Sequence, residues 1–338
     1  MVNNYRYFVI AMVMFISMIN YIDRGAISYA QQFIIAEYGF NALSWGQVLG
    51  FFGYGYIFGG FFGGLLADKK GPKFIWILAA VTWSIFAMFM GLAGEVGVMF
   101  FGGSALIGFA VFRILFGLAE GPVFASLNRT AANWAAPRER GIFGAIGGLG
   151  VPLGALITAP VAVFLLSTVG WKWMFVVLGA AGIIWAIIWA RIFTDYPEDH
   201  PKVSEEELKI IRSADDLLET ESTVNSSKDK KHVPWYHFFK NPTLIFNAIG
   251  FFAFNYVNFL MLTWTPKYLQ DVFHFQLSSL WYIGMIPWVG ACIALPLGGK
   301  ISDMIRKKTN NLRLARAGVC GVSFFLTIVF FCLIISYG

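Results

Sequence analysis

The chain has 338 residues, of which 58% are hydrophobic and only 13% are Asp, Glu, Lys or Arg, roughly half the charged share of an ordinary soluble protein. A soluble globular domain cannot bury that much apolar surface, so the composition excludes this class. The net charge of +6 fits either a basic nucleic-acid-binding face or basic loops on one side of a membrane.

Nine segments are long and apolar enough to cross a bilayer as a helix, which takes about 20 residues. The first is longer than the apolar region of a signal peptide, and no small-residue cleavage pattern follows it, so we expect it to be retained. The fourth is predicted as one long helix although it contains Arg113 and Glu120. The predicted limits are 7–29, 46–67, 74–94, 98–125, 141–167, 171–193, 243–266, 279–300 and 314–337.

The basic residues are distributed unevenly between the two sides of the membrane. Of the 25 Lys and Arg residues, 21 fall at the N-terminus or in connections on its side, whereas two, Lys172 and Lys267, fall on the other. Because Lys and Arg accumulate in cytoplasmic loops, the N-terminus and the central linker are predicted to be cytoplasmic, in a multi-pass protein of the cell membrane. This topology explains the basic balance, so no nucleic-acid partner is expected.

Residues 194–242 form the long polar stretch of the sequence and hold 11 of its 19 Asp and Glu residues. Ser204 followed by Glu207 is typical of a capping box that opens a short helix. Residues 222–231 are polar enough to form a flexible tether. The linker therefore divides the chain into 1–193, with six spans, and 243–338, with three.

A ten-residue pattern follows the second span and occurs again after the eighth, at 64–73 and 299–308. Both copies read Gly-x-Leu/Ile-x-Asp followed by basic residues, which is typical of a transporter built from two repeated halves. We predict a conformational-switch loop in which the Asp accepts hydrogen bonds from the N-terminal amides of a neighbouring helix. A charge cluster placed by topology alone is the alternative. The residues concerned are Gly64, Asp68, Lys69, Gly71, Lys73, Asp303 and Arg306.

These repeated loops resemble the signature loop of the major facilitator superfamily. Residues 20–24, Arg113 to Pro122, and Asn128 to Trp134 resemble its anion:cation symporter branch, which includes bacterial sugar-acid transporters. The resemblance implies an all-α polytopic membrane protein with twelve spans in two six-helix bundles. Residues 1–193 then correspond to the N-terminal bundle and 243–338 to the first three helices of the C-terminal bundle. On this basis we expect the sequence to be truncated.

Four charged residues remain inside the predicted spans: Asp23, Arg24, Arg113 and Glu120. A charge at a helix centre costs about 3 kcal/mol on insertion, so such groups normally face a partner or a cavity. The seven-residue spacing puts Arg113 and Glu120 on one helix face, roughly 10 Å apart and too far for direct pairing. We predict that the arginines attract an anion and the carboxylates carry protons. Static pairs of Asp23 with Arg24 and of Arg113 with Glu120 are the alternative.

The resemblance implies the same roles for these four residues and adds Tyr21 and Tyr56 as contacts to substrate hydroxyl groups. For any tyrosine in so aromatic a chain, interhelical packing is the alternative. From the residues themselves, Asn255 and Asn258 are polar groups in the apolar seventh span. They either face the same cavity or hydrogen-bond between helices.

The sequence predicts a proton-coupled secondary transporter that imports an organic anion by alternating access. A sugar acid resembling galactonate, glucarate or a hexuronate is the expected substrate. The sequence has Val151 and Phe251 where the sugar-acid relatives carry substrate-binding glutamines, so a less hydroxylated anion remains open. An anion exchanger or uniporter of the same fold and a non-transporting membrane sensor are the alternatives.

No enzyme activity is expected, because the spans contain no nucleophile and base set and no metal-ligand cluster. The cysteines, Cys292, Cys320 and Cys332, lie apart in apolar stretches without disulfide or zinc spacing. We therefore expect no metal and no cofactor, with protons as the coupling ion. The expected partners are the anion, protons and the lipid bilayer, and the protein is expected to be a monomer.

Overall fold

The structure is a computed structural model that describes residues 4–136, 139–212 and 239–337. Within these ranges every regular element is a helix, and nine helical segments are long and apolar enough to cross a membrane. This confirms the predicted all-α membrane fold. The helices are α1 (Tyr5–Tyr38), α2 (Ala42–Lys70), α3 (Pro72–Phe89), α4 (Ala93–Phe100), α5 (Ala105–Glu120), α6 (Val123–Trp134), α7 (Arg140–Thr168), α8 (Gly170–Ile192), α9 (Glu205–Arg212), α11 (Pro242–Asp271), α12 (Leu280–Ile283), α13 (Ile286–Thr309) and α14 (Val319–Tyr337).

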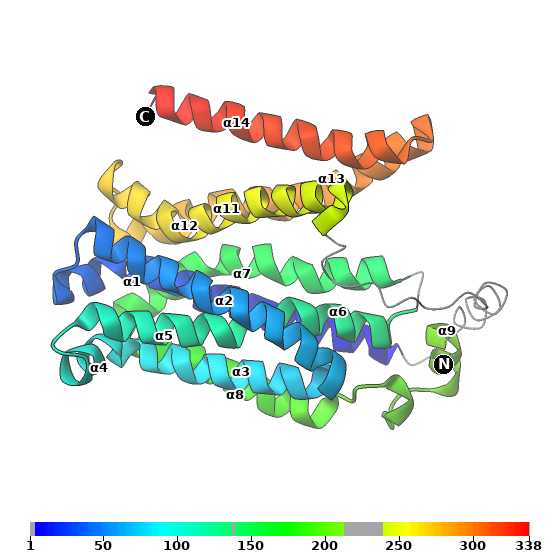
Figure 1. Ribbon diagram of the computed structural model, residues 1–338, viewed down its shortest axis with the longest axis horizontal. Helices are drawn as coiled ribbons and strands as arrows, with labels where there is room; N and C mark the ends of the chain where they lie inside the picture. The colour runs from blue at the N-terminus through cyan, green and yellow to red at the C-terminus, as the bar shows by residue number, and fades with distance from the viewer. Residues whose placement is uncertain (1–3, 137–138, 213–238, 338) are drawn as a thin grey trace. The chain divides into compact units, whose positions relative to one another are not determined.

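The chain forms two compact units, Met1–Met285 and Ile286–Gly338. In the first unit, α1 packs on α7, α2 on α5, and α3 on α8, and Figure 1 shows α2, α5, α3 and α8 as neighbouring helices. Helix α11 contacts α1, and α12 contacts α7. In the second unit, a π-helical turn at Leu314–Gly318 joins α13 to α14. The division of the chain into two bundles at the linker stays a prediction.

The limits of the fourth span differ from those predicted. Residues 98–100 end α4, and the fourth span begins at Ala105 and continues through α6 to Trp134. The break falls at Gly102 and Gly103, whose φ angles of 64° and 83° lie in the left-handed region that favours glycine. The hydropathy is continuous across this turn, so the pattern of apolar residues alone did not reveal it.

Glycines bring α2 and α5 into backbone contact. A Cβ atom added to Gly55 would lie 1.9 Å from the carbonyl oxygen of Ile114, and one added to Gly59 would lie 2.2 Å from that of Leu118. On the opposing helix, a Cβ on Gly117 would lie 2.2 Å from the carbonyl oxygen of Phe52. The glycines of the second span thus permit close helix packing.

The first copy of the predicted switch loop is mostly helical. Gly64, Asp68 and Lys69 lie in the last turns of α2, and Gly71, with φ of 83°, forms the short connection to α3, which contains Lys73. The sequence predicted that Asp68 would accept from the amides of a neighbouring helix, and this was wrong.

Asp195 takes the role that was predicted for Asp68. Its Oδ1 accepts a hydrogen bond of 2.7 Å from the backbone N–H of Lys73 at the start of α3. Asp68 instead lies 3.9 Å from Arg129 of α6, and both side chains are exposed. An acidic residue at a helix N-terminus is favoured by the helix dipole, and here it comes from the segment that follows α8.

The second copy of the pattern is also helical rather than a loop. Asp303 and Arg306 lie in the last turns of α13, which ends at Thr309. Asn310 follows with φ of 51°, in the left-handed region, where asparagine is tolerated better than most residues. In both copies the helix therefore continues through the charged residues that follow its apolar part.

The described part of the linker contains α9, whose first turn is capped as predicted. The hydroxyl of Ser204 accepts a 3.2 Å hydrogen bond from the backbone N–H of Glu207. The side chain of Glu207 does not return to its own helix, as the full capping box requires, but reaches α1. Residues 222–231, the predicted tether, lie outside the described residues.

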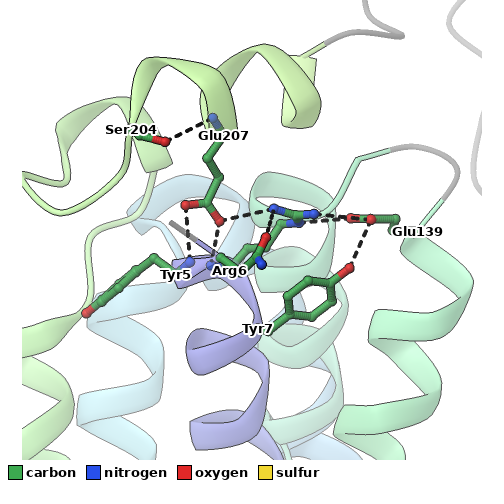
Figure 2. A network of polar contacts seen from close by, with 7 residues as sticks. Tyr5, Arg6, Tyr7, Glu139, Ser204 and Glu207 are labelled. Atoms are coloured by element: carbon green, nitrogen blue, oxygen red, sulfur yellow. Dashed lines mark hydrogen bonds and ion pairs between the residues drawn. The ribbon is translucent and has the colours of Figure 1, made fainter. Parts of the chain in front are cut away.

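Glu207 caps the N-terminus of α1 (Figure 2). Its carboxylate accepts from the backbone N–H groups of Tyr5, at 3.1 Å, and Arg6, at 2.9 Å. The Arg6 guanidinium also lies 3.2 Å from Glu207 and donates to both oxygens of Glu139, at 3.0 and 3.3 Å. Hydrogen bonding from Arg6 holds the pKa of Glu139 below its usual range. This cluster joins α1, α9 and the residue preceding α7.

A second ionic cluster lies at the opposite end of α1. Lys172 at the start of α8 pairs with Glu37 of α1 at 2.7 Å and with Glu95 of α4. The indole of Trp171 donates a 3.0 Å hydrogen bond to Glu37, and the hydroxyl of Tyr38 donates one of 3.0 Å to Glu95. Both ends of α1 are therefore tied to neighbouring helices by charged groups.

Replacing Glu207 by alanine is expected to lower the free energy of unfolding by about 2 kcal/mol, because it removes a helix cap and leaves Arg6 short of one buried partner. Thermal unfolding of the purified protein measures the change. Glu206→Ala is the matched control, since Glu206 is the preceding residue of α9 and is exposed. Equal unfolding temperatures for the two variants would contradict the capping role.

Candidate functional site

Arg24 and Glu120 form a buried ion pair between α1 and α5. The Glu120 Oε2 atom accepts from the Arg24 Nε at 3.0 Å and from its Nη2 at 2.8 Å. Arg24 Nη2 also lies 3.3 Å from the side-chain oxygen of Asn20, one turn earlier on α1. Glu120 is fully buried and Arg24 is 5% exposed. The pair thus holds two opposite charges inside the helix bundle.

Three aromatic rings surround the Arg24 guanidinium. Its central carbon lies 4.7 Å from the ring centre of Tyr21, 4.9 Å from that of Phe52 and 4.8 Å from that of Tyr56. Cation–π contacts of this kind are strengthened where water is excluded. The structure therefore places Tyr21 and Tyr56, both predicted as site residues, directly against Arg24.

Arg113 of α5 is buried and bonded to main-chain carbonyls. Its Nε donates to the carbonyl oxygen of Val48 at 3.2 Å, and its Nη2 donates to that of Leu49 at 3.3 Å. The guanidinium carbon lies 4.9 Å from the ring centre of Phe52. Among the described residues no carboxylate lies at ion-pair distance from Arg113, so its direct contacts are main-chain carbonyls and aromatic rings, while the charge of Glu120 acts on it from farther away. We call Arg24, Arg113 and Glu120 the arginine site.

Asp23 lies beside Trp83 of α3, and its charge also interacts with that of Glu120. It is 3% exposed, and neither of its carboxylate oxygens has a hydrogen-bond partner among the described residues. The side chain of Trp83 lies beside it, but the indole nitrogen makes no hydrogen bond of ordinary geometry there. Adjacent positions on a helix differ by about 100°, so Arg24 can face the site while Asp23 faces a neighbouring helix.

The static pairs considered as an alternative are not the pairs that form. In the described ranges Arg24 pairs with Glu120, and no ion pair joins Asp23 to Arg24 or Arg113 to Glu120. One oxygen of Glu120, Oε1, is buried without a partner. Buried polar atoms without partners are uncommon, because each one loses its hydration without compensation.

The two asparagines of α11 do not contact the arginine site. Asn255 is exposed, and its amide donates to the carbonyl oxygen of Phe251 on its own helix at 2.9 Å. Asn258 is half-buried. Helix α11 reaches the site through Phe259, whose ring stacks on that of Phe52 with centres 6.2 Å apart.

Two residues that complete the site were not predicted from the sequence. Asn20 lies four residues before Arg24, so the helical period places both on the same face. Asn20 could therefore have been predicted from this spacing. Phe52 is one of 35 phenylalanines, and nothing in its local pattern distinguishes it. Within residues 4–136, 139–212 and 239–337 no cluster of three or more potential metal ligands occurs.

A sequence profile described as Major Facilitator Superfamily matches residues 13–338. The chain is 33% identical over 311 residues to the "Hexuronate transporter" of Bacillus subtilis, covering 92% of this chain and 66% of that protein. It is 31% identical over 316 residues to the "Probable sulfoacetate transporter SauU" of Cupriavidus necator, covering 93% and 69%. Both relatives are named as transporters rather than enzymes.

The fold is similar to a crystal structure of a bacterial homologue of the human lysosomal transporter Spinster, in an inward-facing and occupied conformation. The TM-score is 0.67 at 21% identity, over 90% of this chain and 62% of that one. This likeness concerns the fold alone. The chain spans about two thirds of the length of the proteins that it matches.

Proposed function

Because the chain belongs to the major facilitator superfamily, we propose that it is part of a proton-coupled secondary transporter that imports a small organic anion. Transport proceeds by alternating access, in which the two halves of the protein rock about a central site. The N-terminus and the linker lie on the cytoplasmic side of the cell membrane, as the excess of Lys and Arg on their side of the chain favours.

The observation that carries this proposal is that Arg113 is buried without a carboxylate in direct contact among the described residues. Arg24 and Glu120 neutralise each other, whereas Arg113 has no acidic partner among the described residues. A buried cation is unfavourable unless it is paired, so the site favours an anion that arrives with the opposite charge. A guanidinium suits this role because it donates two parallel hydrogen bonds to a carboxylate and stays charged.

Glu120 and Asp23 are the proposed proton carriers. Each is buried and has at least one carboxylate oxygen without a partner in the described part of the chain. A proton on Glu120 removes its negative charge and weakens the ion pair with Arg24. The Arg24 guanidinium then becomes available to the anion, which couples proton binding to substrate binding.

The substrate class is a small carboxylate, and a sugar acid is the first choice. The relative named for hexuronates supports a hydroxylated anion, and Tyr21 and Tyr56 beside Arg24 offer hydroxyl groups for it. The relative named for sulfoacetate supports the less hydroxylated anion that Val151 and Phe251 leave open. Glucuronate and sulfoacetate are therefore the two probes that separate these substrates.

Replacing Glu120 by glutamine is expected to abolish accumulation of glucuronate driven by a pH gradient, while exchange of glucuronate across the membrane continues. Glutamine keeps the shape of the side chain and an oxygen that accepts from Arg24, but it carries no proton in transit. Uptake by proteoliposomes with and without an imposed gradient measures both activities. Glu206→Gln, at an exposed position of α9, is the control.

Accumulation by the Glu120→Gln variant that equals the wild type would contradict proton coupling through this residue. A wild-type protein that exchanges the anion but never accumulates it under a pH gradient would favour an exchanger or uniporter. Failure of the wild type to move or bind any anion would favour a sensor of the same fold.

A further inference from the structure

Phe52 of α2 contacts both buried arginines. Its ring centre lies 4.9 Å from the guanidinium carbon of Arg24 and 4.9 Å from that of Arg113. In the part of the chain that the structure describes, it is the one ring within cation–π distance of both. The two cations come from different helices, α1 and α5, so a residue of a third helix forms the link between them.

The position of Phe52 is fixed by its own packing. Its side chain is 2% exposed and lies among the rings of Tyr56, Phe116 and Phe259, with centres 5.4, 5.8 and 6.2 Å away. Its carbonyl oxygen lies where a Cβ on Gly117 would come within 2.2 Å, so the α2 backbone is pressed against α5 at this residue. The ring therefore has little freedom to move relative to α5.

We propose that Phe52 is a positioning residue that holds Arg24 and Arg113 in the arrangement required to bind one organic anion. Two guanidinium groups in a buried site repel each other, and the negative face of an aromatic ring attracts both. A fixed ring thus holds the two guanidinium groups in the binding geometry before the anion arrives, so that less conformational entropy is lost when the anion binds. This inference rests on the proposed function, because it assumes that the arginines bind an anion.

The test compares leucine and tyrosine at position 52. Leucine keeps an apolar side chain but has no aromatic face, whereas tyrosine keeps the ring. We expect Phe52→Leu to bind glucuronate and sulfoacetate about tenfold more weakly than the wild type, and Phe52→Tyr to restore most of the affinity. Isothermal titration of the purified full chain in nanodiscs gives the dissociation constants.

Phe109→Leu is the matched control, since Phe109 is equally buried on α5 but packs on Tyr38 and Phe40 rather than on an arginine. A role in packing alone lowers the unfolding temperatures of Phe52→Leu and Phe109→Leu alike and changes neither affinity. If Phe52→Leu fails to fold, Phe52→Met takes its place, because methionine adapts to irregular spaces.

Two results overturn the inference, and they are distinguishable. If the wild type binds either anion and the Leu or Met variant binds it equally well, Phe52 has no positioning role and the proposed function stands. If the wild type binds neither anion, the proposed substrate class fails and this inference fails with it. Tenfold weaker binding in Phe52→Leu, rescued by tyrosine, supports it.

Discussion

Replacing Arg113 by alanine is expected to reduce anion uptake at least a hundredfold, roughly the effect of removing one partner of a buried, hydrogen-bonded charge pair. The guanidinium is the one charge of the arginine site that forms no ion pair with a carboxylate among the described residues. Without it, the remaining Arg24 and Glu120 cancel, and the site offers the anion no net attraction. Uptake of labelled glucuronate into proteoliposomes measures the loss.

Arg113→Lys separates charge from geometry. Lysine keeps the positive charge but lacks the fork that reaches two carbonyl oxygens and a carboxylate together, so we expect an intermediate uptake. Arg191→Ala, which removes an exposed arginine at the end of α8, is the control for the overall loss of a positive charge. Normal uptake by a folded Arg113→Ala variant would overturn the assignment of the anion site.

Replacing Gly55 by leucine is expected to prevent assembly of the first unit. Even a Cβ atom there would lie 1.9 Å from the carbonyl oxygen of Ile114, so α2 and α5 must separate to admit any side chain. Backbone atoms cannot rotate away as a flexible side chain does. Separating α2 from α5 therefore breaks the other packing contacts between these two helices. We expect the yield of monodisperse protein to fall to about a tenth or less, measured by size-exclusion chromatography of a fluorescent fusion.

Gly53→Leu is the matched control on the same helix. Nothing lies within 4 Å of a Cβ added at Gly53, so the same substitution two residues away leaves the helix contact intact. Leucine also has a better helix propensity than glycine, and this favours the control further. Equal yields from the two variants would show that α2 and α5 do not approach as closely as described.

The long apolar helices could be predicted from the sequence because a membrane span is recognised by its length and hydropathy. The ends of the helices were less predictable. The turn at Gly102 and Gly103 interrupts an apolar tract without a change in polarity. Asp68 and Asp303 lie inside helices, although the spans were predicted to end before these residues. Hydropathy measures where the bilayer ends, whereas capping and turns determine where the helix ends.

The charged residues of the site were predictable because each is expensive inside a membrane. Their pairing was not, because it depends on how α1 turns against α5. The helical period shows that Asp23 and Arg24 face different directions, but only the packed structure shows that Arg24 meets Glu120. Phe52 and the carbonyl groups of Val48 and Leu49 carry no signal at all, since apolar side chains and main-chain atoms are common to every span.

The ionic clusters at the two ends of α1 limit how this helix can respond to an anion. Sliding α1 along its axis breaks the contacts of Arg6 at one end or those of Glu37 at the other. Because α1 is held at both ends, it is expected to move as a rigid body and to keep its register against α7 and α8. Arg24 lies near the middle of α1, so we expect it to respond to the proposed anion by a movement of its side chain, or by a movement of α1 together with the neighbouring helices.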